Sequence, residues 1–117
     1  MKYSVKVVKL GEMVQEFIEE KMLIIFNENA PEELAEISVL HTIDALKEDV
    51  EVGDTIEIGN IKYEVVAVGW EANKTLRELG HCTLKFKNSN TADLPGVINL
   101  RGEELKEIKI GETISIY

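Results

Sequence analysis

The sequence contains few of the residues that form cross-links or carry catalysis. Its 117 residues include one cysteine, Cys82, and two histidines, His41 and His81. A single cysteine excludes a disulfide within the chain and fits a reducing compartment, so we expect a cytoplasmic protein. No apolar run reaches the roughly 18 residues of a membrane-spanning helix, and no basic and apolar leader begins the chain. We therefore expect neither membrane insertion nor export.

Basic residues are also scarce. The chain has 13 lysines and arginines against 22 aspartates and glutamates, which gives a formal net charge of −9. Because an acidic protein repels phosphate backbones, we expect no binding to nucleic acid. The sequence has no glycine-rich phosphate loop, no CxxC pair and no HExxH motif. We expect no cofactor and no metal.

Alternation of apolar and polar residues predicts that most of the chain is β-strand. A chain of 117 residues that is 44% hydrophobic can bury one core, so we expect a single domain over residues 1–117. Gly59 and Asn60 are suited to the tight turn of a hairpin. Asn27 ends the second apolar run of the chain. The predicted strands cover residues 2–10, 22–26, 36–47, 55–58, 61–69, 81–87, 96–102 and 112–117.

Helical patterns are short. Residues 12–20 place apolar side chains on one side, and a proline opens a helical turn at residues 31–35. Residues 73–80 predict one or two turns, with Asn73 as the N-cap and Gly80 as the left-handed end. Together these elements predict a mainly β fold, a small closed antiparallel, Greek-key-like barrel of about six to eight strands with one or two short helices.

His41 lies in the apolar stretch EISVLHTIDALK, residues 36–47. In a strand it shares one face with Ile37, Val39 and Ile43. A histidine in such a place is often structural, with one backbone carbonyl as its hydrogen-bond partner. A neutral imidazole also offers a lone pair for nucleophilic attack at cytoplasmic pH. The residues alone leave both interpretations open.

His81 follows the predicted helix end at Gly80, a junction where side chains often reach a surface cleft. A solvated imidazole near a helix C-terminus is an equally good interpretation. Cys82 alternates with Leu84 on the expected inner face, which favours a core residue over a nucleophile. Arg77 is suited to binding an anion, yet its place in the predicted helix favours an exposed side chain.

A zinc site is a weaker hypothesis. The side chains of His41, His81, Cys82 and Asp44 are of the types that bind zinc. Their spacing in the sequence matches no diagnostic zinc motif. The hypothesis therefore depends on whether the fold brings these four residues together.

The stretches LRELGHCTLKF and LPGV, and the strand with LHTIDALK, resemble the glucitol/sorbitol-specific IIA component of the bacterial phosphoenolpyruvate-dependent sugar phosphotransferase system (PTS). The similarity runs from the first strand through MLIIF and APEEL to GETISIY, and LRELGH is its most specific part. It implies a phosphotransferase of the cytoplasm. Such a phosphocarrier accepts a phosphoryl group from phospho-HPr and passes it to the IIB domain of a membrane glucitol/sorbitol permease.

The resemblance also implies which histidine is phosphorylated. In that family the phosphorylated histidine lies in the strand with the apolar run, which corresponds to His41. Some members have a second histidine two positions later, where this chain has Ile43. His81 is the other histidine of the chain and hence the candidate for stabilising the phosphoryl group. The alternative function is a non-catalytic small β-barrel, a binding or accessory module with structural histidines.

Overall fold

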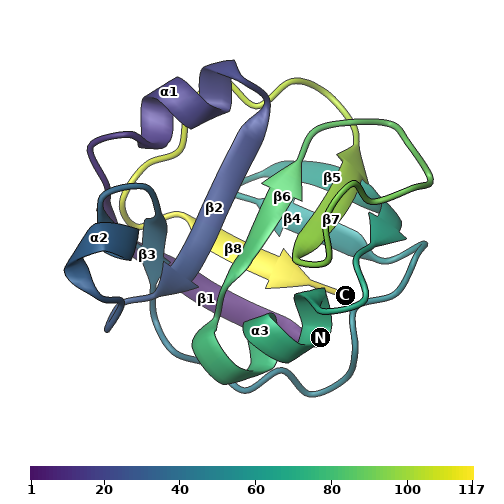
Figure 1. The fold of residues 1–117 in the computed structure, drawn as a ribbon, viewed down its shortest axis with the longest axis horizontal. Coiled ribbons are helices and arrows are strands. Elements are labelled where there is room, and N and C mark those ends of the chain that lie inside the picture. Colours follow the sequence, from purple (N-terminus) through teal and green to yellow (C-terminus); the bar gives the residue numbers. More distant parts are fainter.

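The computed structural model describes residues 1–117, which form eight strands and three short helices (Figure 1). The strands are β1 (Tyr3–Leu10), β2 (Met22–Asn27), β3 (Val39–His41), β4 (Thr55–Ile58), β5 (Ile61–Val68), β6 (Cys82–Lys85), β7 (Val97–Arg101) and β8 (Thr113–Ile116). The helices are α1 (Val14–Glu19), α2 (Glu32–Ala35) and α3 (Ala72–Leu79). The strands close into one barrel in the order β1-β3-β2-β6-β7-β5-β4-β8. The mainly β, closed barrel expected from the sequence is confirmed.

The barrel is mixed, whereas we expected antiparallel pairing throughout. The neighbours β2 and β3 are parallel, and so are β6 and β7. Each of these pairs is joined by a connection that returns along the barrel, residues 28–38 and residues 86–96. Alternation within a strand reports its buried face and not the direction of its neighbour, so the sequence pattern did not distinguish the two arrangements.

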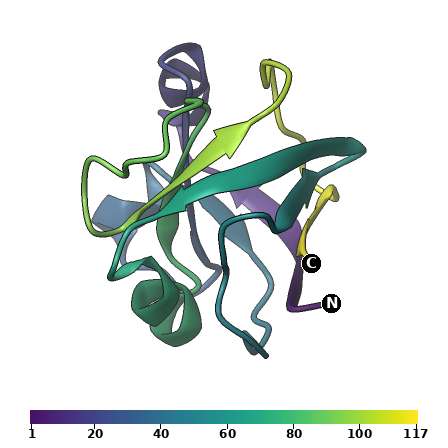
Figure 2. The same cartoon turned by 90° about the vertical axis from the view of Figure 1, so that its right-hand side faces the viewer.

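The inner faces of the strands form one hydrophobic core, and helices cover the two ends of the barrel. Tyr3, Val5 and Val7 of β1 are buried, as their alternation predicts. Figure 2 shows α1 and α3 at opposite ends of the barrel. The buried side chains of α3 are Ala72 and Leu76. None of the helices has both the length and the apolar character needed to cross a membrane.

Two local predictions about α3 had different outcomes. Gly80 ends the helix with a positive φ of 62°, as predicted. Asn73 does not cap the helix, because the N-cap is Glu71. The side chain of Asn73 instead binds the backbone of Val50, with Oδ1 accepting from its N–H at 2.7 Å and Nδ2 donating to its carbonyl at 3.1 Å. A contact with a distant loop thus replaces the local cap.

The strand predicted over residues 36–47 is much shorter in the structure and ends at His41. Beyond His41, side chains occupy N–H groups of β1 that a longer strand would need. Thr42 Oγ1 accepts from the N–H of Lys6 at 2.9 Å, and Asp44 Oδ2 accepts from the N–H of Ser4 at 2.9 Å. These bonds end the β-ladder and place His41 at the last position of β3.

Candidate functional site

His41 lies inside the barrel, at the end near α3. Its side chain is 0% exposed. It shares the inner face of β3 with Val39, which belongs to the hydrophobic core. Asn27, at the end of β2, is paired in register with His41 across the two parallel strands. The ring of Tyr3 meets the imidazole edge-on, with 6.1 Å between the ring centroids. The imidazole is therefore held between the core and the covered end of the barrel.

Both ring nitrogens of His41 face backbone carbonyl oxygens. Nδ1 lies 2.8 Å from the oxygen of Thr42, and Nε2 lies 2.8 Å from the oxygen of Gly80. A protonated imidazole donates to both, but a neutral one has a single N–H and donates to one. Burial, the largest influence, lowers the pKa of His41, while the two carbonyls and the charge of Glu28 oppose that shift. A neutral ring therefore donates a hydrogen bond to only one of the two carbonyl oxygens.

The two carbonyls belong to different segments of the chain. Thr42 follows His41 in the chain and keeps its carbonyl close to Nδ1, whereas Gly80 belongs to the junction between α3 and β6. The neutral tautomer with its proton on Nδ1 donates to the carbonyl of Thr42 and has a lone pair on Nε2. That is the form of imidazole that attacks an electrophile.

Gly80 fits against His41 because it has no side chain. A Cβ at this position would lie 2.0 Å from Oδ1 of Asn27 and 2.8 Å from Cε1 of His41. Asn27 is itself 9% exposed, and its Oδ1 has no hydrogen-bond partner. The sequence predicted Gly80 as a helix end and Asn27 as the end of a run, and neither as part of a site. The signal for Asn27 was that it continues the inner-face alternation of Leu23 and Ile25.

His81 lies on the other face of β2. Its Nδ1 is 3.0 Å from the carbonyl oxygen of Ile25, and its ring packs on Phe26 at 4.7 Å between centroids. Phe26 alternates with Asn27 along β2 and so faces away from the inner surface that His41 occupies. The carbonyl of the residue before His81, and not its ring, makes the contact with His41. A role for the His81 ring stays a prediction.

The other candidates have structural partners. Cys82 is buried, which raises the pKa of its thiol to about 12, so it is a core residue and not a thiolate nucleophile. Arg77 is exposed and pairs with Asp49 at 2.7 Å. Asp44 binds Lys47 at 3.0 Å in addition to the N–H on β1. No three histidine, cysteine or acidic side chains are placed to hold a metal ion, so the hypothetical zinc set does not form.

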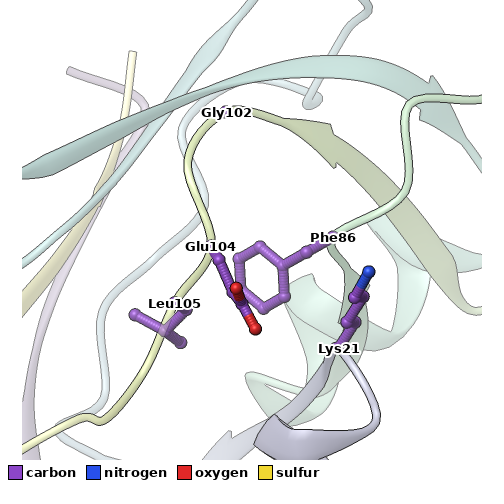
Figure 3. Close-up of a pocket in the computed structure, with 5 residues that line it drawn as sticks. All are labelled: Lys21, Phe86, Gly102, Glu104 and Leu105. Atoms are coloured by element: carbon purple, nitrogen blue, oxygen red, sulfur yellow. The ribbon is translucent and has the colours of Figure 1, made fainter.

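The surface pockets lie away from His41. The one in Figure 3 is lined by Lys21, Phe86, Gly102, Glu104 and Leu105, which belong to the α1 end of the barrel. Neither histidine lines any of the five pockets in the structure. Nε2 of His41 is thus covered by Gly80 and not open to a pocket.

Comparisons with known proteins agree with this architecture. The crystal structure of a PTS system IIA component from Enterococcus faecalis V583 matches with a TM-score of 0.87 at 29% identity, over 97% of this chain and 98% of that one. The fold is thus that of a PTS IIA component. The family model of the PTS system glucitol/sorbitol-specific IIA component matches residues 2–115. The glucitol/sorbitol-specific EIIA components of Shigella flexneri and Escherichia coli (strain K12) are 34% identical over 112 residues, 96% of this chain and 91% of each relative. The chain belongs to the glucitol/sorbitol-specific IIA family, as the sequence resemblance predicted.

Substitution of Gly80 tests the packing at His41. We expect Gly80→Ala to lower the free energy of unfolding by about 1–3 kcal/mol or more, because it adds left-handed strain to a steric clash. Gly53→Ala is the control, since Gly53 also has a positive φ, 97°, but nothing within 4 Å of an added Cβ. Urea denaturation measures both. Equal losses in the two variants would contradict a specific packing role for Gly80.

The pH dependence of stability tests the protonation of His41. Its pKa in the fold lies below the ordinary value of 6.5, so the unfolded chain binds the extra proton first as pH falls. The stability due to neutral His41 is complete above about pH 6.5 and is lost as pH falls toward the pKa in the fold. We expect a fall in unfolding free energy between about pH 7 and pH 5, and a smaller fall in His41→Gln. Identical slopes would assign the effect to other groups.

Proposed function

We propose that the protein accepts a phosphoryl group on His41 from phospho-HPr and passes it to the IIB domain of a membrane glucitol/sorbitol permease. Membership of the IIA family supports phosphotransfer in general, with HPr and IIB as the kinds of partner. The single observation behind the choice of atom is the position of the His41 ring, fixed at Nδ1 by Thr42 and covered at Nε2 by Gly80. Residues 1–117 act as one IIA domain, in the cytoplasm.

The transfer requires the neutral ring of His41. Nδ1–H donates to the carbonyl of Thr42, and the lone pair of Nε2 attacks phosphorus. The Nε2–P bond forms while the bond from phosphorus to the donor's histidine nitrogen breaks, and its electron pair returns to the donor ring. His41 becomes a phosphorylated imidazolium whose Nδ1–H still binds Thr42. The donor, which began as the cationic phosphohistidine, leaves as a neutral imidazole.

Access to Nε2 requires displacement of the Gly80 carbonyl, and exposed apolar side chains beside the site offer a docking surface for the partner. Ile43, two residues after His41, is 60% exposed, and Leu79, the residue before Gly80, is 45% exposed. Each side chain adjoins one of the two segments that bind the His41 ring. A partner that binds both side chains forms new contacts there, and these offset the loss of the hydrogen bond between Gly80 and His41.

Phosphorylation of a His41 variant tests the proposal. We expect His41→Gln to remain folded and to take up no phosphoryl group from phosphoenolpyruvate, enzyme I and HPr, because it lacks the nucleophilic nitrogen. Intact mass spectrometry after the reaction checks this through an acid-labile, alkali-stable mass increase, with wild type as the positive control. Uptake by His41→Gln at the normal rate would refute the assignment. An unlabelled wild type would favour the non-catalytic binding module.

A second proposal concerns His81, which we expect to stabilise the migrating phosphoryl group. When Nδ1–H donates to the carbonyl of Ile25, only the protonated ring has a further N–H for a phosphoryl oxygen. Because His81 follows Gly80, displacement of the Gly80 carbonyl also moves His81. We expect His81→Ala to be phosphorylated at His41 roughly ten- to a thousandfold more slowly. Quench-flow labelling gives the rates, and unchanged transfer to and from the variant would exclude this role.

A further inference from the structure

Asn27 is a buried polar residue beside His41 whose side-chain oxygen has no hydrogen-bond partner in the fold. It is paired with His41 across β2 and β3 and is 9% exposed. Its Oδ1 makes no hydrogen bond. An unpaired buried polar group costs about 1–3 kcal/mol, so its presence in a native core requires an explanation.

A second buried asparagine shows what a structural explanation looks like. Asn99 on β7 also has an unpartnered Oδ1, but its Nδ2 donates to the carbonyls of Ser89 at 3.0 Å and Thr91 at 3.1 Å. Asn99 therefore holds the loop that precedes β7. No comparable bond fixes the amide of Asn27, which lies against Gly80.

The side-chain amide of Asn27 and the Nε2 side of the His41 ring both lie against Gly80. A Cβ added to Gly80 would lie 2.0 Å from Oδ1 of Asn27 and 2.8 Å from Cε1 of His41. The carbonyl oxygen of Gly80 lies 2.8 Å from Nε2 of His41. A group that becomes bonded to Nε2 must occupy space that Gly80 vacates. The side-chain amide of Asn27 borders that space.

We propose that Asn27 binds the phosphoryl group, its side-chain amide nitrogen donating a hydrogen bond to a phosphoryl oxygen during transfer and in phosphorylated His41. This inference rests on the proposed function. Rotation about the Cβ–Cγ bond of Asn27 exchanges the amide oxygen and nitrogen, so Nδ2 can replace Oδ1 at the border of this space. A neutral donor suits an anionic group, whereas a carboxylate at this position would repel it.

Transfer rates of three variants test the inference. We expect Asn27→Ala to take up phosphoryl from phospho-HPr roughly ten- to a thousandfold more slowly than wild type, the range for loss of one transition-state donor. Asn27→Asp should be slower still, because its carboxylate repels the phosphoryl oxygens. Asn99→Ala, the matched control, should lose stability in urea but keep the wild-type rate.

A spectroscopic measurement on the wild-type protein needs no variant. We expect the side-chain amide signals of Asn27 in 1H–15N NMR spectra to shift on phosphorylation of His41, and those of Asn99 to stay in place. A shift shows that the amide of Asn27 lies beside the phosphoryl group, and the rate of Asn27→Ala shows whether it stabilises that group. If wild type is phosphorylated while Asn27→Ala reacts at the normal rate or the signals do not move, the inference is wrong and the proposed function stands. If wild type takes up no phosphoryl group, both fail.

Discussion

The hydrogen bond between Nε2 of His41 and the carbonyl of Gly80 connects the candidate site to the rest of the fold. Gly80 ends α3 in a left-handed conformation, and the next residues begin β6. The same glycine packs on both Asn27 and His41, which leave no room for a Cβ. One residue therefore ends a helix, covers the end of the barrel and blocks the nitrogen that would carry the phosphoryl group.

Burial and hydrogen bonding have opposite effects on the protonation of His41. Two carbonyls at 2.8 Å suit a protonated ring, while burial lowers the pKa of His41 and favours the neutral ring. A net hydrogen bond contributes only about 0.5–1.5 kcal/mol, so a neutral ring holds Gly80 weakly at best. The neutral ring that the proposed transfer requires is thus also the form with the weaker hold on Gly80.

The sequence predicted what local patterns determine and missed what depends on neighbours in space. Alternation identified the buried face of β1, and the glycine after LREL predicted the end of α3 correctly. The short β3 depends on Thr42 and Asp44 reaching N–H groups of β1, a strand more than thirty residues away in the chain. The sequence marked Asn27 only as the end of an apolar run, because its place beside His41 depends on the parallel pairing of β2 with β3.

The two faces of β2 contact the two histidines of the chain from different sides. Asn27 on the inner face adjoins His41, and Phe26 on the outer face supports His81. Leu76 of α3 and Cys82 of β6 are each 1% exposed and anchor the chain on both sides of the turn. These two buried side chains fix both ends of the turn at residues 77–81, the segment that covers Nε2 of His41. The barrel fixes the orientation of the imidazole, and the short turn between Leu76 and Cys82 covers its Nε2.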